Sequence, residues 1–209
     1  SATEQASPLD DSAAAPETLE RERREHLDRL GVEAWRGRGW TGRGVKVAIL
    51  DTGFRGYAAQ RGKALPARLL CRSFRADGQL EARPSQHGVL CAEVIHALAP
   101  DAELLFANWE PDHAESFLEA VAWARRQGAR VVSCSVIMPS WSDGQGGGAT
   151  HHALARLLGA GDKADDLFFC ACAGNTALRH WHGAGAPDGD GWHCWAADRN
   201  ENALTPWGQ

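Results

Sequence analysis

Residues 44–53, G-V-K-V-A-I-L-D-T-G, are the stretch that indicates the fold class. Five apolar residues, three of them β-branched, precede Asp51, and Thr52-Gly53 follows it as a turn. A short run of this kind predicts a strand that is buried on both faces. A carboxylate at the end of such a strand is costly to bury unless it is hydrogen-bonded, paired or functional. Asp51 is therefore either a cap of the following turn or part of a site, and the stretch alone leaves both readings open.

Strand and helix patterns alternate along the rest of the chain. Further strands are predicted at 69–74, 102–108, 129–137, 165–175 and 191–198, and helices at 17–30, 89–99, 114–127 and 150–158. This alternation predicts an α/β protein with a mainly parallel sheet that carries helices on both faces. We expect residues 1–16 to be a flexible tail or linker, 17–31 an N-terminal helix, and 32–209 the main domain.

The composition excludes several classes of function. The chain has 209 residues, of which 44% are hydrophobic, so it can build a real core. A net charge of −5 gives no electrostatic footprint for nucleic acid, so no nucleic-acid partner is expected. No apolar run reaches the length of a membrane span, and no membrane partner is expected.

The cysteines predict free thiols rather than a disulfide framework, because several of them lie in apolar runs where a thiol acts as a small hydrophobe. Cys170-x-Cys172 resembles half of a metal site, but strand alternation alone places both residues on one face. His180-Trp181-His182 is interpreted as an aromatic loop cluster. Neither a metal site nor a cofactor is therefore predicted. The six cysteines are Cys71, Cys91, Cys134, Cys170, Cys172 and Cys194.

Three polar residues fall at comparable places in the predicted architecture. Asp51 ends a strand, His87 begins a helix, and Asn175 ends another strand. In a parallel sheet such positions gather at one edge. A carboxylate there can orient an imidazole, the imidazole can act as a general base toward a hydroxyl, and an amide can donate to an oxyanion.

The blocks around these residues resemble those of the subtilisin-like serine proteases, the subtilases. V-A-I-L-D-T-G surrounds Asp51, H-G-V-L-C-A-E-V-I follows His87, and C-A-C-A-G-N ends at Asn175, in the order that the family has. G-W-T-G-R-G-V-K-V ahead of the first strand and A-L-A-P-D-A-E-L after the His helix also match. The resemblance implies a subtilisin-like three-layer α/β/α fold from about residue 31 to the end of the chain.

The resemblance also implies roles for individual residues. Asp51 would orient the imidazole, His87 would be the general base, and Asn175 would complete the oxyanion hole. One wall of the substrate site would pair with the peptide as an added strand, and the opposite wall would lie at 108–110. The residues implied to bind substrate are Asn108, Trp109, Ser133, Ser135, Val136 and Ile137.

Departures from the family pattern concern the nucleophile and one pocket wall. The family's catalytic serine lies in a G-T-S block after the oxyanion Asn, and residues 176–209 contain no such block. We therefore expect the chain alone to be inactive, with the serine supplied by a C-terminal segment or a second chain. Val89 stands where the family usually has Thr, and Ile137 stands where a Gly usually leaves room for a substrate side chain.

Two other interpretations remain beside a serine endopeptidase acting on polypeptides. The first is a non-catalytic subtilase-fold scaffold that binds peptides or partners, which the missing serine and nine tryptophans favour. The second takes D-T-G as an aspartic protease signature, but that fold needs a second Asp block, which this sequence lacks. The family resemblance favours an extracytoplasmic or secreted location, whereas free thiols favour a reducing compartment.

Overall fold

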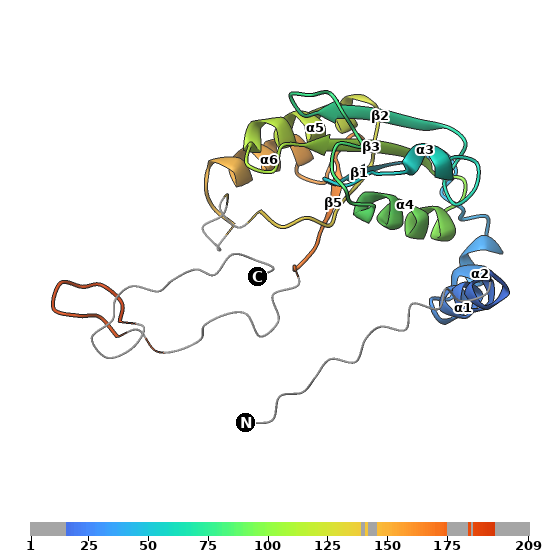
Figure 1. The fold of residues 1–209 in the computed structure, drawn as a ribbon, viewed down its shortest axis with the longest axis horizontal. Helices are drawn as coiled ribbons and strands as arrows, with labels where there is room; N and C mark the ends of the chain where they lie inside the picture. Colours follow the sequence, from blue (N-terminus) through green and yellow to red (C-terminus); the bar gives the residue numbers. More distant parts are fainter. Residues whose placement is uncertain (1–15, 139–140, 142–145, 175–183, 185, 195–209) are drawn as a thin grey trace. The chain divides into compact units, whose positions relative to one another are not determined.

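The structure is a computed structural model, and it describes residues 16–138, 141, 146–174, 184 and 186–194. The chain forms two compact units, 1–174 and 175–209. Figure 1 shows the helices and strands, all of which belong to the first unit. Among the described residues of the second unit, Pro187 and His193 form an isolated antiparallel bridge around a turn.

The first unit contains alternating helices and strands, in the order expected of an α/β protein. The helices are α1 (Pro16–Arg29), α2 (Val32–Arg36), α3 (Tyr57–Gln60), α4 (His87–Leu98), α5 (Ala114–Arg126) and α6 (Ala149–Leu158). The strands are β1 (Lys46–Leu50), β2 (Leu69–Phe74), β3 (Glu103–Trp109), β4 (Val131–Cys134) and β5 (Phe168–Ala171).

All five strands are parallel and form one sheet in the order β2-β3-β1-β4-β5. The central strand is β1, in which Leu50 pairs with Ala107 of β3 and with Cys134 of β4. Because the strands are parallel, their carboxyl ends lie at the same edge of the sheet. That edge is where the residue after β1, Asp51, is held.

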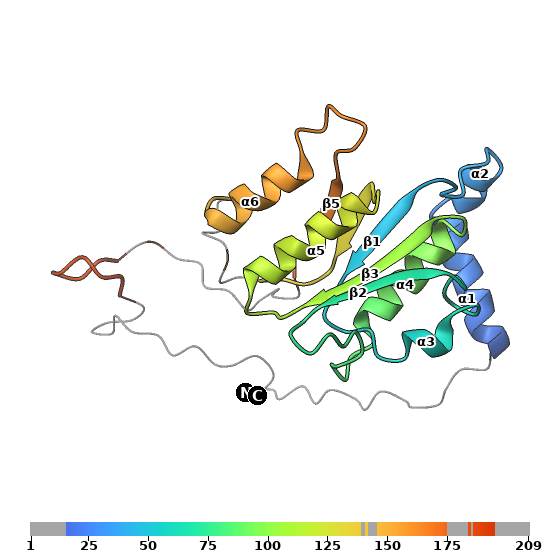
Figure 2. The same ribbon diagram turned by 90° about the horizontal axis from the view of Figure 1, so that it is seen from above.

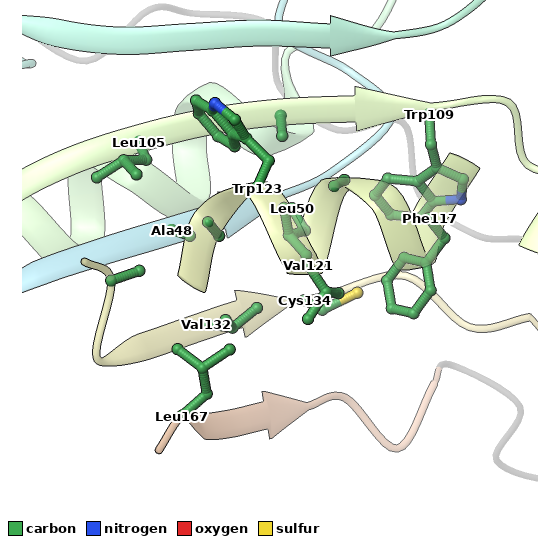
Figure 3. Packing of buried hydrophobic residues seen from close by; sticks show 14 residues of the cluster. Ala48, Leu50, Leu105, Trp109, Phe117, Val121, Trp123, Val132, Cys134 and Leu167 are labelled. Carbon is green, nitrogen blue, oxygen red and sulfur yellow. The ribbon is translucent and has the colours of Figure 1, made fainter. Parts of the chain in front are cut away.

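Two hydrophobic clusters cover the two faces of the sheet, which makes three layers. On one face, α5 packs on the sheet through Phe117 and Trp123, which lie near Trp109 of β3 in Figure 3. Helix α6 packs against the same cluster. On the other face, α4 packs through Val89 and Ala92 on alternate residues of β1 and β3. In Figure 2, α4 accordingly lies apart from α5 and α6.

The structure confirms the predicted fold class and most of the predicted elements. The strand predicted at 129–137 is shorter, because the chain leaves the sheet after Cys134. The short helices α2 and α3 were not predicted, since neither carries a full apolar stripe. The strand predicted at 191–198 is present only as the bridge at His193, and residues 195–198 lie outside the described part of the chain.

The α6–β5 turn is closed by a single carboxylate. Oδ2 of Asp166 accepts hydrogen bonds from the backbone N–H groups of Gly161 at 2.8 Å, Asp162 at 3.1 Å and Lys163 at 3.1 Å. Its Oδ1 lies 3.3 Å from Nη2 of Arg125 on α5. These partners stabilise the ionised carboxylate, and the bond from Lys163 is the largest cause that lowers the pKa of Asp166.

Replacing Asp166 by Asn should therefore reduce stability in a pH-dependent way. A folded-state pKa below the unfolded value stabilises the fold above the unfolded pKa, and this contribution disappears as pH falls through the folded-state pKa. The difference in unfolding free energy between the unmodified chain and Asp166→Asn should shrink toward acid pH in urea titrations. Asp112→Asn, at an exposed aspartate, controls for the charge change. A difference that grows toward acid pH would contradict this assignment.

A second prediction compares two phenylalanines in the sheet. Phe106 is fully buried and stacks on Phe54 with ring centroids 4.7 Å apart, whereas Phe168 is 68% exposed. Phe106→Ala should cost about 3–5 kcal/mol of unfolding free energy because it leaves a cavity. Phe168→Ala makes the same chemical change and should cost no more than about 0.5 kcal/mol. Chemical denaturation of the 209-residue chain measures both, and equal losses would show that the described core is wrong.

Candidate active site

Asp51 is held at the carboxyl edge of the sheet by its own backbone and by the turn after it. Its N–H donates to the carbonyl of Ala107 at 3.1 Å, which extends the β1–β3 ladder by one residue. Only 1% of Asp51 is exposed. Oδ1 accepts a hydrogen bond from the N–H of Gly53 at 2.9 Å, so Asp51 does cap the following turn. Its other oxygen remains for a second partner.

That second partner is His87, the first residue of α4. Nδ1 of His87 lies 2.6 Å from Oδ2 of Asp51, and the His87 side chain is 51% exposed. An ionised carboxylate can only accept, so Nδ1 carries the proton in this hydrogen bond. In the neutral imidazole Nε2 is then an acceptor. In this arrangement Asp51 can orient the imidazole and His87 can act as a general base, which are the two roles predicted for the pair.

Close backbone packing brings the two residues together. The N–H of Gly88 donates to the carbonyl of Gly53 at 2.7 Å, and a Cβ at Gly88 would lie 2.7 Å from Cβ of Asp51. Ser85, just before α4, accepts from Arg55 N–H through its carbonyl at 2.9 Å and from His87 N–H through Oγ at 3.2 Å. Glycine at position 88 therefore sets how near α4 can approach the end of β1.

The strand register places a row of polar side chains across this edge. Ser73 pairs with Asn108. Asn108 and Ser135 directly follow Ala107 and Cys134, the two residues that pair with Leu50, and Asp51 directly follows Leu50. Cys172 continues the row, since its N–H donates to the carbonyl of Cys134 at 3.2 Å. The row shares a sheet face with Ile49 and Phe106, the face that α4 covers.

The residues predicted on the 108–110 wall are buried. Asn108 and Trp109 are each 0% exposed. The Trp109 ring packs edge-on against the Phe117 ring, with the ring centroids 5.1 Å apart. Nδ2 of Asn108 donates to the carbonyls of Gln79 at 2.9 Å and Leu80 at 3.1 Å. Both side chains thus stabilise the fold in this structure, and contact with a peptide on this wall would involve the main chain.

The residues predicted on the other wall lie at the end of β4 and beyond it. Ser133 pairs with Cys170 inside the sheet, and Val136 packs against the core on the α5 face. Ile137 is 37% exposed, and its Cδ1 and Cγ2 approach to 3.1 Å from where a Cβ on Gly174 would be. Its side chain therefore occupies the space beside Gly174. Asn175 lies outside the described residues, and its oxyanion role stays a prediction.

Cys91, which the sequence predicted only to be a free thiol, is a further neighbour of the Asp–His pair. It lies one turn after His87, and its Sγ is 4.0 Å from Nδ1. The spacing i, i+4 on a helix was the available signal. Burial is the main cause that raises the pKa of the Cys91 thiol, and burial raises that of Cys134 to about 12. Both thiols are therefore protonated at neutral pH and are weak nucleophiles.

Gly88→Ala should disrupt the Asp51–His87 pair. The new methyl group would overlap Asp51 and Phe54 at 2.7 Å, so α4 has to move away from β1. We expect a loss of about 1–3 kcal/mol of unfolding free energy, typical of overpacking. The strongly deshielded proton resonance of the short Nδ1–H···Oδ2 hydrogen bond should also be lost. Gly189→Ala, where a Cβ would meet nothing within 4 Å, is the control, and an unchanged resonance in Gly88→Ala would contradict the described packing.

Comparisons with known proteins show which family and which solved structures the chain is similar to. The profile of the subtilase family, peptidase family S8, matches residues 42–200. The crystal structure of MycP1 with its N-terminal propeptide removed is similar, with a TM-score of 0.54 and 22% identity over 78% of this chain and 52% of that one. A lanthipeptide protease matches with a TM-score of 0.40 and 22% identity, over 49% of this chain and 32% of that one. Among curated proteins, no sequence matches.

The chain thus spans about half the length of the MycP1 structure that it resembles. In the described part of the chain, no helix is both long and apolar enough to cross a membrane. The fold is that of subtilisin-like proteases, and the family match extends over most of the chain, including Asp51 and His87. The chain therefore belongs to the subtilase family.

Proposed function

We propose that the intact protein is a serine endopeptidase in which Asp51 orients His87 and His87 is the general base. The observation that carries this proposal is the 2.6 Å contact between Nδ1 and the buried carboxylate, with the imidazole half exposed. The carboxylate holds the tautomer whose Nε2 accepts a proton from a hydroxyl nucleophile, and it stabilises the imidazolium that forms. Asn175 would donate to the oxyanion of the tetrahedral intermediate.

We further propose that the nucleophile comes from outside residues 1–209, so that this chain alone is inactive. Ser135 follows Cys134, the residue of β4 that pairs with Leu50, and its hydroxyl interacts with the thiol of Cys91, whose sulfur lies 4.0 Å from Nδ1. Ser135 is therefore on the side of the imidazole that the carboxylate already occupies. Ser133 is inside the β4 ladder. The hydroxyl that faces Nε2 would belong to a C-terminal segment or to a second chain.

The proposed substrate is an extended polypeptide. Past Cys134 and Cys172 the β4–β5 ladder ends, and the chain continues through Val136 and Ile137 at the carboxyl edge of the sheet. A main chain leaving a sheet in this way can pair with a peptide as an added strand. Ile137 beside Gly174 would restrict the size of the peptide side chain bound there.

A non-catalytic scaffold is the second candidate, and the filled space beside Gly174 favours it. The tryptophans divide between two roles in the described part of the chain. Trp109 and Trp123 are buried in the core, whereas Trp35, Trp40 and Trp192 are 50%, 62% and 67% exposed. Exposed indole rings of this kind are typical contact residues at interfaces.

Peptide hydrolysis by the intact protein tests the endopeptidase proposal. Asp51→Asn should reduce kcat by about 10⁴-fold, because the amide no longer selects the productive imidazole tautomer. Glu103→Gln, an equivalent change at the opposite end of the sheet, should leave kcat unchanged. The 209-residue chain should not react with a fluorophosphonate probe. Full activity in Asp51→Asn, or labelling of the 209-residue chain, would overturn the proposal, and an intact protein that binds peptides without cleaving them would establish the scaffold.

A further inference from the structure

Three side chains with different ligand atoms meet at the Asp–His pair. A carboxylate oxygen of Asp51, Nδ1 of His87 and Sγ of Cys91 all lie within 4.8 Å of one another. His87 and Cys91 project from the same face of α4, one turn apart, and Asp51 faces them from the end of β1. Secondary structure therefore fixes the backbone of all three.

This set of donors has the chemistry of a zinc-type site. Imidazole nitrogen, thiolate sulfur and carboxylate oxygen are the ligands that Zn²⁺ takes, with four ligands in a tetrahedral arrangement. A thiolate discriminates against Ca²⁺ and Mg²⁺, which prefer oxygen donors. Three protein ligands leave one position open for water. Asp51 is buried and Cys91 is half-buried, whereas the His87 imidazole is exposed. An ion can therefore enter the site from the side of the imidazole.

The spacing requires only a small adjustment. Bond lengths of about 2.0–2.2 Å to nitrogen and oxygen in a tetrahedral site place those atoms about 3.4 Å apart, and a sulfur at about 2.3 Å lies about 3.6 Å from the nitrogen. The present distances are 2.6 Å from Nδ1 to Oδ2 and 4.0 Å from Nδ1 to Sγ. A tilt of the half-exposed imidazole away from Oδ2 and toward Sγ changes both distances in the required direction.

We propose that Asp51, His87 and Cys91 bind a Zn²⁺-like divalent cation in place of the hydrogen bond between Asp51 and His87. The cation takes the Nδ1 lone pair, the imidazole proton moves to Nε2, and the thiol releases its proton to solvent. One proton is therefore released for each ion bound, and no redox partner is needed. Binding is independent of the peptidase proposal, because all three ligands lie within residues 51–91.

The site would also act on the proposed function. With the metal on Nδ1, Nε2 carries the proton and no longer accepts one from a hydroxyl. Metal binding and general-base function thus exclude each other at one imidazole. The competing interpretation is that Cys91 is only a small hydrophobe beside the pair, and it predicts that no metal binds there.

Titration of the reduced 209-residue chain with Co²⁺, used as a spectroscopic probe, tests the site. We expect a thiolate-to-cobalt charge-transfer absorption in the near ultraviolet that is lost in Cys91→Ser. Cys172→Ser and Cys71→Ser are matched controls and should retain it. In the unmodified chain, Zn²⁺ should move the His87 proton from Nδ1 to Nε2 in nitrogen-detected NMR spectra, a readout that needs no enzymatic activity.

The absorption would be absent from the unmodified chain, or would persist in Cys91→Ser, if the proposal were wrong. Its loss in Cys172→Ser would place the metal at Cys170-x-Cys172 instead and would also overturn it. Thermal unfolding of each variant shows whether a lost signal reflects a lost fold. The NMR result on the unmodified chain stands even if Cys91→Ser does not fold, and an unmoved His87 proton would refute the site.

Discussion

The structure depends on the cost of burying the Asp51 carboxylate at the end of the central strand. A buried ionised group requires hydrogen-bond donors, and only two reach it in the described residues: the N–H of Gly53 and Nδ1 of His87. The first fixes the turn after β1, and the second fixes where α4 begins. Gly88 has to be a glycine because any Cβ there would separate the strand from the helix. The two buried oxygens of the Asp51 carboxylate thus determine the turn, the start of α4 and the orientation of the imidazole.

The parallel sheet brings the other polar groups to the same edge. Asn108 and Ser135 directly follow the two residues that pair with Leu50, yet they differ in what they do. Asn108 is fully buried and ties the loop before α4 to β3, whereas Ser135 interacts with Cys91. Asp51 and Cys91 consequently both lie on the Nδ1 side of the His87 imidazole, and neither of these contacts uses Nε2. The two proposals therefore use different nitrogens of the same imidazole. His87 acts as a base toward a hydroxyl on the Nε2 side, and a cation bound on the Nδ1 side prevents this.

The sequence was sufficient to predict the α/β class, the central strand and the pairing of Asp51 with His87. Apolar runs and the D-T-G and H-G blocks can each be recognised within a short segment of the chain. The sequence was not sufficient for side-chain direction at the sheet edge. The family resemblance placed Asn108 and Trp109 at a binding wall, and that role stays a prediction. Alternation along β3 turns the Asn108 side chain toward the carbonyls of Gln79 and Leu80 and the Trp109 ring toward Phe117. Cys91 was predicted only to be a free thiol, since the helix pattern does not show which stripe contacts the end of β1. Contacts of this kind depend on how a helix and a strand pack on each other, so the sequence pattern of either element alone does not predict them.

The central claim is that residues 1–209 supply an oriented general base for a hydroxyl that lies elsewhere. The most direct test is a crystal structure of the intact protein, in which the distance from Nε2 of His87 to the nearest hydroxyl oxygen is measured. We expect a serine Oγ from outside residues 1–209 at about 2.6–3.2 Å from Nε2, with the Asp51–His87 hydrogen bond retained. Finding Ser133 or Ser135 at that distance, or no hydroxyl nucleophile facing Nε2, would contradict it.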